Sequence, residues 1–209
     1  MTQVQTVAPN RGPDERIICA LDVPTVAEAA ALVGRVQDAA GFYKIGLQLF
    51  AVGGMELARD LKAEGRKVFL DWKLHDIGAT VEKAAANLAA SGCDLLTVHA
   101  RPQVMAAAAR GVAGSVLKVL GVTVLTSLTA EDLAADDHSL SPAELVELRV
   151  RQALEAAARL KASGMGAIVI DAVCMNHIDV PTIKAALAKT GGKMVTVEDH
   201  QLIGGFGAM

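Results

Sequence analysis

The sequence predicts an α/β fold with a parallel sheet. Short apolar runs alternate with alanine-rich helical stretches from Arg16 onward, and this alternation is typical of α/β proteins. Each apolar run is nearly continuous, as in parallel strands that helices cover on both faces. Polar residues follow the carboxyl ends of successive runs, which is the edge where parallel sheets and barrels place their sites.

Composition narrows the class of protein. With 209 residues, 52% of them hydrophobic, the chain has material for one domain or at most two. A net charge of −3 and an aromatic content of 3% argue against nucleic acid as a partner. No apolar run reaches transmembrane length, so we expect no membrane contact. Cys19, Cys93 and Cys174 lack metal-type spacing and indicate reduced thiols of a cytoplasmic protein.

Regular elements are expected after residues 1–15, which we predict to be a flexible tail because they contain Pro9, Gly12 and Pro13 and no apolar signal core. The apolar runs predict five strands: Ile17–Val23, Phe42–Leu47, Lys67–Trp72, Asp94–His99 and Leu117–Leu125. Helices are predicted between them: from Thr25 through about Ala40, Leu49–Glu64, Ala79–Ser91 and Pro102–Gly111. Thr25 and Glu28 form a capping box for the first helix, and glycines end the second and third.

The chain beyond the fifth strand is predicted to begin with a polar loop through His138. Ser141 and Glu144 then form another capping box, with Pro142 at the first helical position. Two further strands are predicted at Ala167–Val173 and Lys193–Glu198, which makes about seven in all. A complete barrel of eight strands takes roughly 250 residues, so any barrel formed by this chain would be incomplete.

Five successive strands each place a polar residue at or just past the carboxyl end, which predicts a shared active site. These residues are Asp22, Lys44, Asp71 with Lys73, His99 and Ser127.

Asp71 and Lys73 lie where the third strand meets its loop, with Asp76 a few residues beyond. Side chains alternate along a strand, so Asp71 and Lys73 should share a face. An acid and an ammonium held close together form a candidate proton-transfer pair. A structural ion pair is the alternative. For His75 and His99, roles as ligands or acid–base groups compete with simple hydrogen bonding to a neighbour, which is the favoured interpretation.

Five motifs give the chain a family resemblance over residues 17–154. They are Ala20-Leu21-Asp22-Val23, Tyr43-Lys44-Ile45-Gly46, Asp71-Trp72-Lys73-Leu74-His75-Asp76-Ile77-Gly78 with Thr80, Thr97-Val98-His99-Ala100, and Val124-Leu125-Thr126-Ser127-Leu128. With them the chain resembles the orotidine 5′-monophosphate decarboxylase family of pyrimidine and UMP biosynthesis. The resemblance implies a lyase with a TIM-barrel fold, working as a homodimer on a nucleotide without metal or organic cofactor.

The resemblance also implies catalytic roles for four residues. Lys73 would protonate C6 of the pyrimidine, and Asp71 would lie near the departing carboxylate. Lys44 would belong to the surrounding charge network. Asp76 would reach the nucleotide of the partner subunit, so that the dimer completes the site.

Three further residues are implied to bind substrate. Asp22 would contact the ribose, and Ser127 would contact the pyrimidine. Thr80, like the neighbouring Asp76, would reach the partner subunit's nucleotide.

The C-terminal part resembles another family. It is similar to the C-terminal domain of transketolase in the motif Glu198-Asp199-His200 followed by Gly204-Gly205-Phe206-Gly207. That domain is not the part of transketolase that holds thiamine diphosphate. We therefore expect a chimera, in which a decarboxylase-like (β/α)5 portion, residues 16–155, is joined to a transketolase-like segment, residues 156–209, that completes or caps the same domain.

This junction would replace the strands that grip the substrate's phosphate, so activity is expected to be weak or lost. The alternatives are a non-catalytic scaffold, or a related sugar-phosphate decarboxylase. The same Asp-x-Lys-x-x-Asp arrangement occurs in 3-keto-L-gulonate 6-phosphate decarboxylase and in hexulose phosphate synthase, which use a metal.

Overall fold

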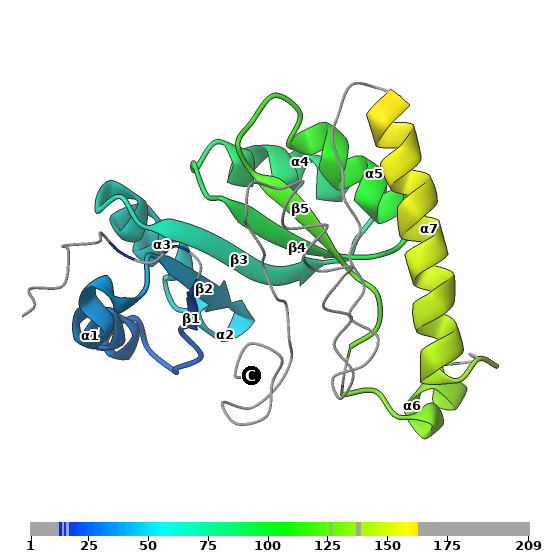
Figure 1. The fold of residues 1–209 in the computed structure, drawn as a ribbon, viewed down its shortest axis with the longest axis horizontal. Helices are drawn as coiled ribbons and strands as arrows, with labels where there is room; N and C mark the ends of the chain where they lie inside the picture. Colours follow the sequence, from blue (N-terminus) through cyan, green and yellow to red (C-terminus); the bar gives the residue numbers. More distant parts are fainter. Residues whose placement is uncertain (1–12, 14, 16, 126, 137–138, 163–209) are drawn as a thin grey trace, which may run out of the picture. The chain divides into compact units, whose positions relative to one another are not determined.

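The computed structural model describes residues 13, 15, 17–125, 127–136 and 139–162 (Figure 1). Five strands form one sheet in the order β1-β2-β3-β4-β5: Ile18–Ala20, Phe42–Gly46, Lys67–Leu74, Leu95–His99 and Lys118–Val122. The pairs β1–β2, β3–β4 and β4–β5 are parallel. The predicted α/β class is therefore confirmed, and within the described residues the sheet is open, as expected for an incomplete barrel.

The chain divides into two compact units, Met1–Val68 and Phe69–Met209, with the boundary inside β3. The predicted strands at Ala167–Val173 and Lys193–Glu198 lie outside the described residues, as does most of the predicted tail.

The first unit contains β1, β2 and three α-helices, namely α1 at Val26–Val36, α2 at Leu47–Phe50 and α3 at Gly54–Ala63, with a short 3₁₀ helix at Gln37–Ala39. The Thr25 hydroxyl caps α1 by accepting a hydrogen bond from the Glu28 backbone N–H, at 3.2 Å. Leu21, Tyr43, Ile45 and Leu49 are fully buried and form the centre of this unit's core.

The predicted continuous helix Leu49–Glu64 is wrong, because the chain breaks it into α2 and α3. Gly53 takes a left-handed conformation, with φ of 114°, which side chains other than glycine rarely adopt. A Cβ on Gly54 would lie 2.8 Å from the Leu49 carbonyl oxygen. The two glycines therefore allow a tight turn between α2 and α3.

The second unit contains most of β3, β4, β5 and four helices, α4 at Gly78–Ala89, α5 at Pro102–Gly111, α6 at Ala130–Ala135 and α7 at Pro142–Ala162. Figure 1 shows α4 and α5 side by side against β4 and β5. These helices approach so closely at Gly111 that a Cβ there would lie 2.3 Å from the Glu82 carbonyl oxygen. Small residues let the helices pack at this distance.

The predicted polar loop through His138 is wrong in part, since it contains α6. Thr129 and Asp132 form a full capping box: the Thr129 hydroxyl accepts from the Asp132 N–H at 3.1 Å, and Asp132 accepts from the Thr129 N–H at 2.8 Å. The predicted capping box of α7 is confirmed, because the Ser141 N–H donates to the Glu144 carboxylate at 2.9 Å.

Helix α7 spans the predicted boundary between the two portions. It runs for 21 residues and passes without interruption through residues 155 and 156, where we predict the junction between the two portions. The junction itself stays a prediction.

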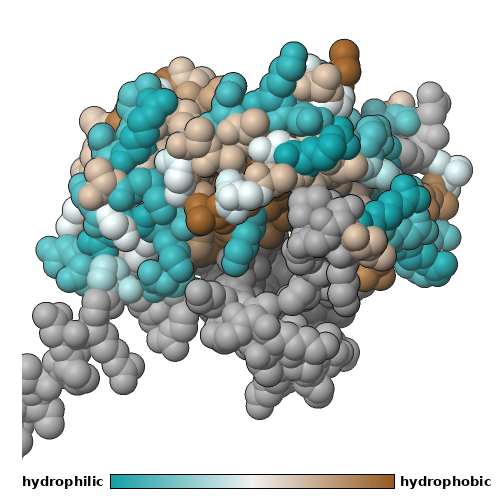
Figure 2. All heavy atoms as spheres, turned by 90° about the horizontal axis from the view of Figure 1, so that it is seen from above, coloured by the Kyte–Doolittle hydropathy of each residue, from teal (hydrophilic) through white to brown (hydrophobic). Residues whose placement is uncertain are grey.

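None of the described helices is long and apolar enough to cross a membrane. Figure 2 shows hydrophilic and hydrophobic residues interspersed over the described part of one face.

Candidate active site

Asp71 is the buried charge around which the site in the second unit is built. It lies on β3 with 5% of its surface exposed. Its carboxylate accepts a hydrogen bond from the Thr97 hydroxyl at 2.9 Å, and the Lys73 ammonium lies 3.2 Å from each carboxylate oxygen. A buried carboxylate needs such partners, because an unpaired ion in the interior is costly. The predicted Asp71–Lys73 pair is therefore confirmed as a contact.

Thr97 links β4 to β3, because its hydroxyl contacts both the Asp71 carboxylate and the Lys73 backbone. It lies on β4, is fully buried, and its hydroxyl also accepts a hydrogen bond from the Lys73 backbone N–H at 2.9 Å. Asp71, Lys73 and Thr97 thus form a closed network, which we call the Asp71 network. Thr97 opens the motif Thr97-Val98-His99-Ala100, but no role for it was predicted from the sequence.

The backbone at Lys73 is left-handed, with φ of 47°. The pairing register between β3 and β4 also shifts between Leu70 and Leu74. A non-glycine residue in this conformation costs of order 1–3 kcal/mol, and such strain is common at functional sites. The predicted strand end at Trp72 is therefore wrong, since β3 continues through an irregularity to Leu74. This irregularity sets the direction of the Lys73 side chain, which is 20% exposed.

A second ion pair lies in the first unit. The Lys44 ammonium is 3.2 Å and 3.4 Å from the two carboxylate oxygens of Asp22. Parallel pairing places Ala20 opposite Lys44, so that Asp22 lies just past the end of β1 beside the end of β2. Gly46 leaves room for the acid, because a Cβ there would lie 3.2 Å from the carboxylate. The structure thus brings these two predicted residues together.

The other predicted site residues lie on the surface of the second unit. Asp76 is exposed and accepts a hydrogen bond from the Ile77 N–H at 2.6 Å, directly before α4. Thr80, on the first turn of α4, and Ser127, in a turn after β5, are also exposed. The contacts recorded for the described residues do not join these three to the Asp71 network.

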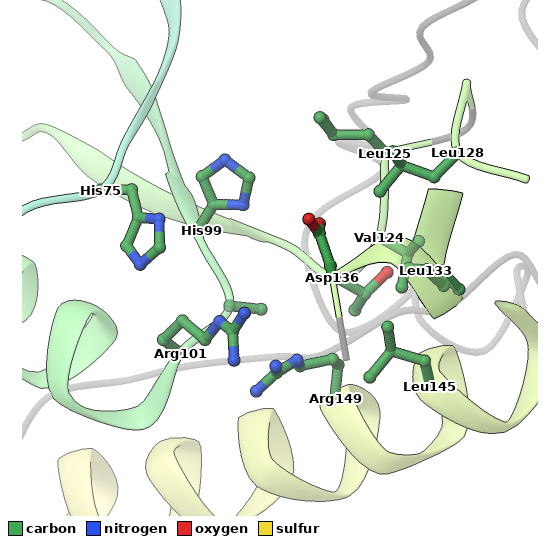
Figure 3. A pocket seen from close by; sticks show the side chains of 12 residues that line it. His75, His99, Arg101, Val124, Leu125, Leu128, Leu133, Asp136, Leu145 and Arg149 are labelled. Carbon is green, nitrogen blue, oxygen red and sulfur yellow. The ribbon is translucent and has the colours of Figure 1, made fainter. Parts of the chain in front are cut away.

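A pocket of about 280 Å³ opens in the second unit beside His99 (Figure 3). The rings of His75 and His99 are 5.0 Å apart at an angle of 43°. Burial lowers the pKa of His99, and the neighbouring His75 and Arg101 lower it further. The predicted fifth strand ends early, at Val122, so that the residues after it line this pocket instead. Sequence reasoning missed Arg101 and Arg149, which also line it.

Metal ligands do not cluster in the part of the chain that the structure describes. No group of three or more His, Cys, Asp or Glu side chains there could hold a metal ion. The described site offers the chemistry of charged side chains: a carboxylate held in place by hydrogen bonds, beside an ammonium that can donate a proton.

The fold and the Asp71 network define an α/β protein of the βα-barrel type with an acid–lysine pair at a strand end. Its sequence matches the profile of the family described as Orotidine 5′-phosphate decarboxylase / HUMPS family over residues 15–200. The chain belongs to this family.

Several relatives carry the name Orotidine 5′-phosphate decarboxylase. The protein of Caulobacter sp. (strain K31) is 60% identical over 143 residues, which are 68% of this chain and 62% of that protein. That of Rhodopseudomonas palustris (strain BisA53) is 52% identical over 141 residues, which are 68% of this chain and 60% of that protein. The chain therefore spans about three fifths of the length of the curated relatives it matches.

Solved structures agree with this assignment. The crystal structure of orotidine 5′-phosphate decarboxylase from Lactobacillus acidophilus is 32% identical, with a TM-score of 0.62 over 68% of each chain. An uncharacterized conserved protein from Geobacillus kaustophilus gives the same identity and TM-score over 69% of this chain and 77% of its own.

The family profile continues past Leu154, where we predicted the resemblance to end, and reaches residue 200. The transketolase-like character of residues 156–209 stays a prediction, because none of the reported matches shows it and the decarboxylase family profile covers this segment as far as residue 200.

Proposed function

We propose that this chain acts as an orotidine 5′-phosphate decarboxylase, converting orotidine 5′-monophosphate to UMP and carbon dioxide in pyrimidine biosynthesis. The observation that carries this proposal is the Asp71 network, in which a buried carboxylate and a partly exposed ammonium are held together at the end of a strand. We state this activity as a proposal because the chain spans only about three fifths of the length of its relatives.

The proposed chemistry breaks the bond between C6 and the carboxylate, and the electron pair stays on C6. The Lys73 ammonium then gives its proton to C6, which forms the new C–H bond, and the lysine regains a proton from water. Fixed charges are well suited to this reaction, because they stabilise developing charge without reorganising. Asp71 would favour departure of the negatively charged carboxylate by repelling it.

The remaining residues are proposed to hold the nucleotide. Asp22 would contact the ribose, and its ion pair with Lys44 would extend the charge network. Ser127 would contact the pyrimidine, without any metal or organic cofactor.

Asp76 and Thr80 are proposed to act across a homodimer, on the nucleotide of the partner subunit. Their exposure beside the start of α4 supports this role, because an exposed carboxylate and hydroxyl are free to meet a second subunit. Within the described residues the sheet has open edges, which also favours self-association. Light scattering after size exclusion should give a dimer, and a monomer at micromolar concentration would contradict the proposal.

The proposal includes a cytoplasmic location, which the free thiol of Cys19 supports. It also includes the division into residues 16–155 and 156–209. If residues 156–209 replace the phosphate-binding strands, turnover should be slow.

The test is a decarboxylation assay that follows the loss of orotidine absorbance. Lys73→Ala should lower the rate by at least about 100-fold, since general acid catalysis is typically worth 10²–10⁴. Lys83→Ala is the matched control, because Lys83 is an exposed lysine on α4. Activity that survives Lys73→Ala would mean a contaminant or a different site.

A second function within the family is decarboxylation of a sugar phosphate, because the family also carries the name HUMPS. Assays with 3-keto-L-gulonate 6-phosphate and added Mg²⁺ separate the two. Tight binding of UMP without any turnover would instead indicate a non-catalytic remnant.

A further inference from the structure

The pocket beside His99 has one strongly cationic side. Arg101, which precedes α5, and Arg149, on α7, both line it together with His75 and His99. Figure 3 shows the two guanidinium groups on the same side of the pocket. Arginine stays protonated at neutral pH, so this side carries two fixed positive charges.

Arg149 is unusual because it is a nearly buried cation. Only 6% of its surface is exposed, and it donates one recorded hydrogen bond, from Nη1 to the Gln152 side chain at 2.8 Å. A guanidinium has five N–H donors. Burial lowers the pKa of Arg149, and the positive charge of Arg101 lowers it further. The two arginines are therefore close enough to repel each other.

Two like charges brought together in a partly buried pocket are costly unless an anion neutralises them. Asp136 is the one carboxylate among the described lining residues, and it is exposed. It contributes at most one negative charge to a pocket that holds two guanidinium groups and two histidines. Among the described lining residues, this balance of charge favours an anionic ligand.

The other walls of the pocket are apolar. They are formed by aliphatic side chains from the segment after β5 and from α6 and α7: Val124, Leu125, Leu128, Leu133 and Leu145. A volume of about 280 Å³ lies near the lower end of the range for ligand sites, roughly 300–1,000 Å³. The pocket thus suits a small molecule with a charged end and a less polar body.

We propose that this pocket binds the phosphate group of a small molecule, with the guanidinium groups of Arg101 and Arg149 as its donors. The guanidinium fork matches phosphate oxygens in a bidentate manner. A phosphate monoester carries about −1.5 to −2 charges at neutral pH, which balances two arginines better than a single carboxylate does. This site does not depend on the proposed decarboxylation, because it uses none of the catalytic residues.

The test is calorimetric titration with inorganic phosphate, ribose 5-phosphate and UMP. Arg101→Met and Arg149→Met should each weaken binding by about tenfold or more, as expected when a charge-assisted hydrogen bond is lost. Arg151→Met is the matched control, because Arg151 lies on the same helix, is 72% exposed and pairs with Glu147. Arg101→Met also guards against misfolding, since Arg101 is only half-buried.

Competition identifies the source of the phosphate. Displacement of inorganic phosphate by UMP at lower concentration points to the nucleotide, and stronger binding of inorganic phosphate points to the free ion. Binding that is absent for all three compounds, or equal in wild type and both arginine variants, overturns the proposal. Lys73→Ala should keep phosphate binding while losing turnover, so failure of the decarboxylase proposal is distinguishable from failure of this one.

Discussion

Thr97→Val tests whether the Asp71 network is held together by one hydroxyl group. Valine has nearly the same shape as threonine but cannot donate to the Asp71 carboxylate or accept from the Lys73 N–H, which are both 2.9 Å from the Thr97 hydroxyl. The Lys73 N–H loses this acceptor at a cost of roughly 1–3 kcal/mol, and the Asp71 carboxylate keeps the Lys73 ammonium but loses one charged hydrogen bond, worth about 1.5–3 kcal/mol. The two losses together give an expected decrease of about 2–6 kcal/mol in the free energy of unfolding.

The matched control is Thr97→Ser, which keeps the hydroxyl and removes one buried methyl group, at a cost of about 1 kcal/mol. Urea unfolding followed by circular dichroism gives both free energies. The valine variant should also lose decarboxylase activity, because the left-handed backbone of Lys73 loses the bond that fixes it. The reasoning is refuted if valine and serine destabilise the protein equally, or if the valine variant keeps full activity.

The packing at Gly111 and the charge of His99 give two further predictions. Gly111→Ala should lower the melting temperature by roughly 2–12 °C, because its Cβ would meet the Glu82 carbonyl oxygen at 2.3 Å. Gly34→Ala, with nothing within 4 Å, should instead be neutral or stabilising, and the same result at both glycines would contradict the packing argument. The pKa of His99 is lowered from its ordinary 6.5, so this side chain binds more protons in the unfolded chain than in the folded one. The folded protein should therefore lose stability as the pH falls from above 6.5 through the lowered pKa. His99→Gln should reduce this loss between pH 7.5 and 5.5 in thermal melts, and an unchanged pH dependence would exclude His99 as its source.

The strands and most helix ends could be predicted from the sequence because they depend on local signals. The capping residues Thr25 and Ser141 and the stop at Gly92 act within a few residues of themselves, and each is found where the pattern indicates. Helix α6 had the same signal, Thr129 followed three residues later by Asp132, and polar composition concealed it. The break after α2 was harder to foresee, since it depends on the close approach of Gly54 to the Leu49 carbonyl oxygen.

The candidate site was predictable only in part, because it depends on contacts between strands. Residues at strand ends could be collected from the sequence, and two pairs, Asp22 with Lys44 and Asp71 with Lys73, are in contact. Arg149 could not be found in this way, since it lies on a helix, 48 residues after Arg101 in the sequence.

The pairing of Asp71 with Lys73 was predicted from the regular alternation of side chains along a strand, yet β3 is not regular at this point. Lys73 has a left-handed backbone, and the register of β3 against β4 shifts around it. The contact therefore depends on Thr97, whose hydroxyl holds both the carboxylate and the irregular backbone. A strained residue persists only where its surroundings fix it, so the ammonium is positioned by a neighbouring strand as much as by its own. This is why we expect a substitution at Thr97 to affect catalysis although its side chain is fully buried.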